Sequence, residues 1–178
     1  MLVAALLVLA AAPSVVSDDA RDKNDSTLSL FATSLSGMSF QLQAPRNETR
    51  GFVVGARAGL HAQRPPLSNG GGRIGIIPTL SIRHDFGSQR TEWTGAVAIS
   101  AEIWRIRIVS GVGYGLTSKP DVTPSHLFEI SMAAGLKFGP VWTGINFDTL
   151  WRFSDGTRAL HVTAQIGIEW EVQREIFR

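Results

Sequence analysis

Residues 52–61 read FVVGARAGLH, and this stretch decides the fold. Apolar side chains occupy every second position: Phe52, Val54, Ala56, Ala58 and Leu60. Small, charged or polar residues lie between them: Gly55, Arg57, Gly59 and His61. Because successive side chains of a strand point to opposite faces, the stretch predicts a β-strand with one apolar and one polar face.

The same alternation recurs along nearly the whole chain after residue 26, and no helix-period segment interrupts it. Pro, Asn, Asp and Gly cluster between the alternating segments, as in loops, and Gly139-Pro140 predicts a tight hairpin turn. The pattern predicts an all-β protein with eight strands, over residues 27–43, 51–62, 73–84, 91–103, 104–117, 125–138, 141–153 and 159–172.

Length and composition narrow the class of protein. The 178 residues suit one domain, and 17 basic against 15 acidic residues predict no nucleic-acid partner. Cys is absent, which excludes disulfides and thiol catalysis. Charged residues make up 18% of the chain, below the quarter or so of a typical soluble domain.

The N-terminus predicts export. Residues 1–17, MLVAALLVLAAAPSVVS, carry no charge, and their apolar run has the length of a signal-peptide core. No Lys or Arg precedes that run, which leaves a start upstream of Met1 open. We therefore expect a signal peptide over 1–17, a polar linker over 18–26 and a barrel over 27–178, located in the bacterial outer membrane.

The direction in which the apolar face points separates a transmembrane barrel from a soluble, lipocalin-like barrel. A membrane barrel turns its apolar face outward, and most of the predicted strands are long enough to cross hydrocarbon. The polar face is rich in Gly, which suits a narrow interior, and its charges nearly cancel. We expect inward, paired side chains at Arg57, Arg105, Arg107, Glu129, Asp148 and Glu169. The predicted cations of the polar face are Arg57, Arg83, Arg105, Arg107, Lys137 and Arg152, and its predicted anions are Glu92, Glu102, Glu129, Asp148, Glu169 and Glu171.

Aromatic residues on the apolar face support the membrane interpretation. If the first strand starts on the periplasmic side, one group falls near the external ends of the strands: Phe40, Phe52, Trp93, Tyr114, Phe128, Trp151 and Phe153. A second group falls near the periplasmic ends: Trp104, Phe138 and Trp170. Two aromatic belts are typical of membrane barrels. Phe31 and Trp142 fall on the polar face, where Trp142 is expected to fill the lumen.

The leader, the eight alternating strands, the lumenal charges and the two belts resemble the small outer-membrane barrels of the OmpA/OmpX type. The resemblance covers residues 27–172 and rests on pattern, not on a diagnostic motif. It implies an antiparallel up-and-down barrel with both termini in the periplasm, inserted by the barrel-assembly machinery. The loops are shorter than usual, and the chain ends EVQREIFR without a terminal aromatic residue.

Candidate chemistry centres on four histidines. His84, Asp85 and Ser88 are the residue types of a hydrolytic triad, but neighbours on a strand point to opposite faces. His126 lies near Ser125 and Glu129, but Leu127 and Phe128 follow it, so the serine of a His-x-Ser pair is missing. His61 and His161 fall on the polar face and are expected to join the lumenal network.

No catalytic, cofactor-binding or metal-binding residue is therefore predicted, and no cofactor. We expect a monomeric barrel in contact with outer-membrane lipid, without enzymatic activity, and with a structural, adhesive or minor-conductance role. The alternatives are an outer-membrane lipid-modifying enzyme and a soluble lipocalin-like carrier of a small apolar ligand.

Overall fold

The computed structural model describes residues 26–42, 50–64, 72–154 and 156–174. The predicted signal peptide and all but the last residue of the predicted linker lie outside these residues. No helix among the described residues is long and apolar enough to cross a membrane. The elements are β1 (Thr27–Leu42), β2 (Arg50–Gln63), β3 (Arg73–Asp85), β4 (Arg90–Ile103), β5 (Ile106–Lys119), β6 (Val122–Phe138), β7 (Val141–Arg152) and β8 (Arg158–Arg174).

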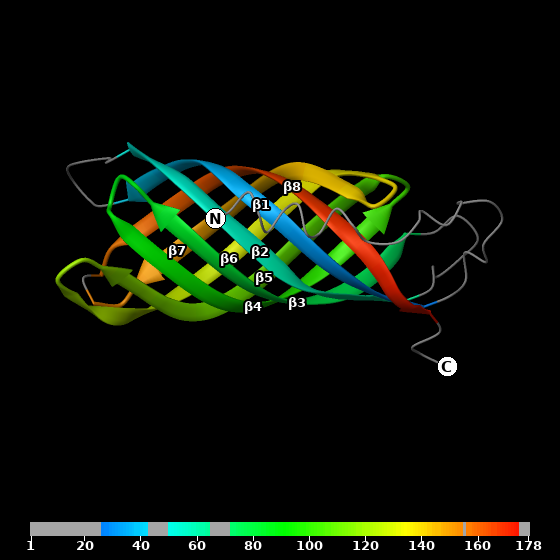
Figure 1. Ribbon diagram of the computed structural model, residues 1–178, viewed down its shortest axis with the longest axis horizontal. Coiled ribbons are helices and arrows are strands. Elements are labelled where there is room, and N and C mark those ends of the chain that lie inside the picture. The colour runs from blue at the N-terminus through cyan, green and yellow to red at the C-terminus, as the bar shows by residue number, and fades with distance from the viewer. Residues whose placement is uncertain (1–25, 43–49, 65–71, 155, 175–178) are drawn as a thin grey trace.

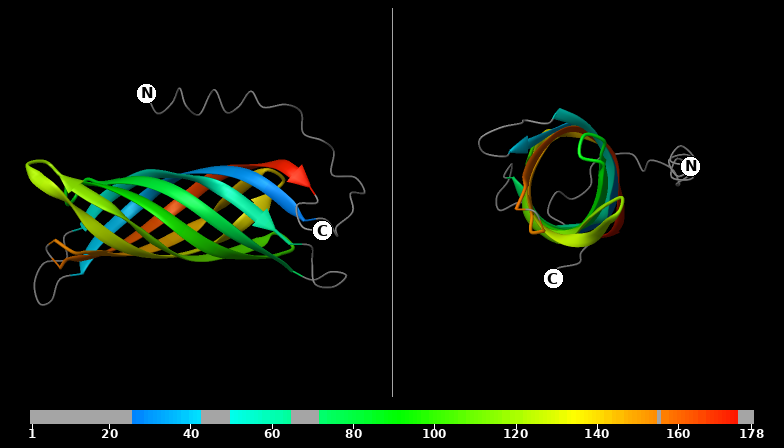
Figure 2. Two further views of the ribbon diagram at one scale, coloured as in Figure 1. Left: turned by 90° about the horizontal axis from the view of Figure 1, so that it is seen from below. Right: turned by 90° about the vertical axis from the view of Figure 1, so that its left-hand side faces the viewer.

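The eight strands form one closed antiparallel barrel in chain order, which confirms the predicted fold. Closure comes from β1 and β8, which pair from Thr27↔Arg174 to Leu42↔Arg158, and the end-on view in Figure 2 shows the complete ring. We call the end where β1 begins and β8 ends the terminal rim, and the other end the opposite rim (Figure 1). Closure leaves no sheet edge unpaired, as a barrel in lipid requires.

Two connections differ from the prediction. The β4–β5 hairpin turns at Trp104 and Arg105, so β5 begins at Ile106 and not at residue 104. Trp104 adopts a φ of 56°, a conformation that few non-glycine residues take. The β5–β6 hairpin is longer than expected, because β6 begins at Val122 and not at residue 125. Gly139, in the predicted Gly-Pro turn, has a φ of 58°.

The barrel has its polar face inside and its apolar face outside. Leu80 is 74% exposed and Ile166 is 61% exposed, whereas Arg83 and Glu129 are fully buried. Every Asp, Glu, Lys and Arg side chain described within the strands lies on the inward phase or at a strand end. The outward band is made of aliphatic residues that include Ile74, Ile76, Leu80, Val97, Ile99, Ile108, Val112, Met132, Ile145 and Ile166. The fold is therefore that of a transmembrane barrel with a polar interior.

Aromatic residues flank the aliphatic band on both sides, as predicted. Near the opposite rim, Phe52, Trp93, Tyr114 and Phe153 are each at least half exposed. Near the terminal rim, Trp104 is 84% exposed and Phe138 is 47% exposed. The structure adds Phe86, which lies in the β3–β4 turn and stacks on Phe52 with 6.2 Å between the ring centroids.

Candidate functional site

The lumen is the part of the molecule where a functional site is to be sought, because it contains nearly all of the buried charged residues. Each strand sends every second side chain inward, so residues distant in the chain meet across the interior. Two networks of ion pairs result. We call them the central network, which contains Arg83, and the terminal network, which contains Arg107 and lies nearer the terminal rim.

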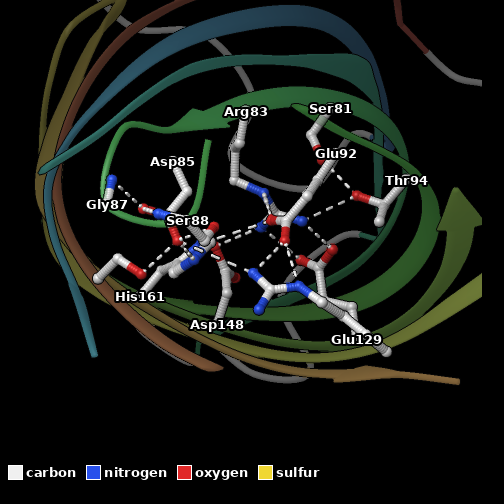
Figure 3. Close-up of polar contacts among 12 residues, drawn as sticks. Ser81, Arg83, Asp85, Gly87, Ser88, Glu92, Thr94, Glu129, Asp148 and His161 are labelled. Carbon is white, nitrogen blue, oxygen red and sulfur yellow. Dashed lines mark hydrogen bonds and ion pairs between the residues drawn. The ribbon is translucent and has the colours of Figure 1, made fainter. Parts of the chain in front are cut away.

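Arg83 is the hub of the central network (Figure 3). Its guanidinium donates to both Glu129 oxygens, with Nη2 at 2.5 Å from Oε2, and its Nη1 lies 2.6 Å from Asp148 Oδ2. Arg57 approaches the same two carboxylates at 3.3 and 3.2 Å. Asn146 also donates to Asp148, at 2.6 Å. These contacts leave the buried charges paired and hydrogen-bonded, which offsets the cost of removing them from water.

The central network continues toward the opposite rim. Arg152 donates to Glu92 from Nε at 3.0 Å and from Nη2 at 2.6 Å, and both side chains are fully buried. Asp85, at the end of β3, accepts from Ser39 at 2.7 Å and from Ser88 at 2.8 Å. It also accepts from the Gly87 backbone N–H at 2.9 Å, which holds the β3–β4 turn.

His161 lies between two of these carboxylates. Its Nε2 is 3.8 Å from Asp85 Oδ2, and its Nδ1 is 3.8 Å from Glu92 Oε2. Neither distance is that of a hydrogen bond, and both ring nitrogens lack a hydrogen-bond partner. The residue types of a triad thus meet here, but Ser39 and Ser88 contact the carboxylate and not the imidazole, so no nucleophile is activated.

The terminal network is organised by Arg107. It donates to Glu102 at 2.6 Å and lies 2.6 Å from Glu169 Oε2. Its guanidinium also lies over the Trp142 ring, 5.4 Å from the centroid. Lys137 adds a second cation, 3.4 Å from Glu169. Trp142 is 6% exposed, which confirms that it fills the lumen.

One arrangement in the terminal network was not predicted. His61 Nδ1 lies 2.9 Å from Glu169 Oε1, and His61 Nε2 lies 2.8 Å from Ser100 Oγ. This is the carboxylate–imidazole–hydroxyl order of a serine hydrolase. Ser100 and His61 are fully buried, however, and a Cβ atom at Gly75 would lie only 2.8 Å from Ser100 Oγ. Inward positions for residues 61, 100 and 169 follow from alternation, but their meeting depends on the register across five strands, β8, β1, β2, β3 and β4.

Apolar residues also enter the lumen, contrary to the simple two-face pattern. Leu127, Leu150 and Ala159 form a fully buried cluster toward the opposite rim, and Val53 is fully buried on the same phase. A cavity of about 40 Å³ separates the two networks and is lined by Arg57, Arg107 and Glu169 among others. Side chains thus fill most of the interior, as expected for eight strands.

The structure corrects the predicted charge balance. Arg105 does not point inward, because it lies in the β4–β5 turn, exposed, with its guanidinium over the Trp104 and Phe138 rings. Glu171 is exposed near the terminal rim, directly before the point in β8 where its register with β1 shifts. Asp85 instead points inward. The lumenal carboxylates are Asp85, Glu92, Glu102, Glu129, Asp148 and Glu169, against the cations Arg57, Arg83, Arg107, Lys137 and Arg152. The other predicted inward residues are confirmed.

The remaining candidate residues do not converge. His84 points away from Asp85 and lies 3.0 Å from Thr91 Oγ1, as strand alternation predicted. His126 is exposed on the outer wall and stacks on Tyr114, with 5.5 Å between ring centroids. Within the described residues, no group of three or more His, Cys, Asp or Glu is placed to hold a metal ion.

Comparison with known proteins supplies no functional assignment for this chain. No protein-family model and no curated protein matches the chain. Among solved structures, Neisserial surface protein A aligns with a TM-score of 0.47 and 10% identity, over 81% of this chain and 97% of that chain. Ail, the attachment invasion locus protein of Yersinia pestis, aligns with a TM-score of 0.32 and 9% identity, over 83% of this chain and 99% of that chain. The fold assignment therefore rests on the closed barrel itself, which has the eight-stranded architecture of the small outer-membrane barrels.

Proposed function

We propose that the chain is an integral outer-membrane barrel without enzymatic activity that acts as a structural or adhesive element and not as a diffusion pore. The observation that carries this proposal is the inside-out distribution of side chains. Hydrocarbon favours the aliphatic band, and the aromatic belts suit the two interfaces. A soluble lipocalin-like carrier would need the opposite arrangement, with an apolar cavity inside.

The filled lumen favours a barrel that conducts no solutes over one with a minor conductance. Arg83, Arg152, Leu127 and Leu150 are all fully buried across the interior. Moving an ion past them requires opening buried ion pairs, which costs several kcal/mol for each charge left unpaired. The wall of such a barrel is held in the membrane, and its external hairpins are then the surface available for adhesion.

Two experiments test this proposal. Membrane fractionation should recover the full-length protein with outer membranes after carbonate extraction, and its migration in detergent gels should change on boiling. Planar-bilayer recordings of the refolded protein should show no stable conductance at neutral pH. Recovery as a soluble periplasmic monomer would refute the membrane assignment, and steady open channels would refute the closed lumen.

One observation supports a second candidate function, that of an outer-membrane hydrolase. Ser100, His61 and Glu169 have the distances of an acyl-transfer triad, although Ser100 is fully buried. A fluorophosphonate probe on the folded barrel separates the two functions. Labelling that disappears in Ser100→Ala and persists in Ser39→Ala would support the hydrolase. Absence of labelling at Ser100 in folded protein, with labelling only after unfolding or not at all, would exclude it.

A further inference from the structure

The outer surface of the barrel has a hollow that extends over β2, β3, β4 and β5. It is a shallow depression, largely open to the outside, and it is lined by Ala58, Leu60, Pro78, Leu80, Gly95 and Tyr114, among others. The hollow extends from the aliphatic band to Tyr114 in the aromatic belt near the opposite rim, and the side chains that line it carry no charge.

Gly95 is the informative residue of this hollow. Eleven other glycines lie within the strands, and an added Cβ at each of them would meet an atom within 3.0 Å, so close packing explains them. A Cβ at Gly95 would meet only Leu80 Cδ2, at 3.7 Å. Packing within the chain therefore does not require glycine at position 95, which faces outward.

Pro78 is a second residue that strand formation does not favour. Pairing of β2 with β3 runs to Gly59↔Thr79 and resumes at Ala62↔Ile76, so it is interrupted opposite Pro78. Proline has no N–H for the ladder and is unusual in the middle of a paired strand. Two unfavourable choices at neighbouring outward positions, with no gain inside the barrel, are typical of a site shaped for something outside it.

The small residues leave room on both sides of one projecting side chain. Ala58, Leu80, Gly95 and Tyr114 follow one another across the strands, through the pairs Ala58↔Leu80, Leu80↔Gly95 and Gly95↔Tyr114. Leu80 is 74% exposed and Tyr114 is 55% exposed, so they stand above Ala58 and Gly95. This profile presents ridges and hollows of the width of side chains, not a flat face.

We propose that this hollow binds an acyl chain of a membrane lipid and holds it in a defined place on the barrel wall. The inference rests on the proposed membrane location, because the hollow is continuous with the band that faces hydrocarbon. A flexible, uncharged chain satisfies an apolar lining without unpaired polar groups. Ordinary lipid contacts would be uniform around the wall, whereas this site predicts preferential contact at β3 and β4.

The test uses the full-length barrel refolded into phosphatidylcholine vesicles that contain a lipid with a photoreactive diazirine at mid-chain. Mass spectrometry maps the labelled residues. Gly95→Leu fills the hollow without meeting the protein interior, and Ala164→Leu is the matched control, since Ala164 is exposed on the outward phase of β8. A heat-shift gel confirms that each variant is folded.

We expect label on Leu80 and Tyr114 to exceed that on the β8 wall, and Gly95→Leu to lower it by about fourfold, the factor for losing roughly one buried methylene. Ala164→Leu should leave label at Leu80 unchanged. Uniform labelling around the barrel, or no change in Gly95→Leu, would overturn the proposal. Recovery of the folded protein in solution, separate from the vesicles, would instead refute the membrane location on which the proposal rests.

Discussion

Removal of Arg83 is the sharpest test of the buried ion cluster. The fully buried guanidinium contacts Glu129 and Asp148, and it also donates to Thr94 at 3.2 Å. In Arg83→Met, a shorter apolar side chain replaces the guanidinium, and both carboxylates lose their closest cation. Breaking a buried pair costs about 3–5 kcal/mol. Arg57 stays near both carboxylates, so we expect the lower end, a loss of about 3 kcal/mol in the free energy of unfolding.

The measurement is reversible urea unfolding of the refolded barrel in detergent or vesicles, followed by the fluorescence of its five tryptophans. Adding Glu129→Gln to Arg83→Met removes one unpaired charge and should recover about 1 kcal/mol or more. Arg158→Met is the control, because Arg158 is exposed at the opposite rim and should change stability by less than about 0.5 kcal/mol. If Arg83→Met matches wild type, or if the double variant recovers nothing, the cluster is hydrated and the argument from buried charge fails.

Three further outcomes follow from the same geometry. Ile166→Arg should oppose membrane insertion by about 2–4 kcal/mol, whereas Gln165→Arg should act through crowding in the lumen. Of two fluorophores placed at these positions, lipid-borne reagents should quench only the one at 166. Gly75→Ala should lower stability by about 1–3 kcal/mol, because its Cβ would lie 2.6 Å from His61 Nε2, while Gly95→Ala should have little effect in the same unfolding assay. Raising NaCl from 0.1 to about 1 M should shift the urea midpoint little, since buried pairs are weakly screened, and a large loss of stability would show that the pairs are solvated.

Alternation in the sequence was enough to predict the strands and their two faces. Leu80, Ile82 and Ile166 are outward and Arg57, Asp148 and Glu169 are inward, because a period of two leaves each residue only one choice once the strand is identified. The turns were predicted less well. Arg105 was predicted to face the lumen because it continues the alternation of a strand. It lies instead in the two-residue turn at Trp104 and Arg105, where strand alternation does not apply.

The partners of each lumenal residue depended on tertiary structure. Local sequence does not state which residue of β4 or β8 lies opposite His61, since the shear of a closed barrel sets those distances. That is why Ser100, His61 and Glu169 were not grouped, and why His161 was not placed between Asp85 and Glu92. Leu127 and Leu150 entered the lumen although their residue type predicts the outer wall.

The sequence alone therefore determined the class of fold, the approximate position of each strand and the face on which most side chains lie, because these depend on neighbours along one strand. Closure of the barrel decided which charges pair, where the lumen is sealed and where the outer wall is hollow. Those properties depend on contacts between strands far apart in the chain, such as Arg57 with Asp148 and Arg83 with Glu129, and no local pattern encodes their distances.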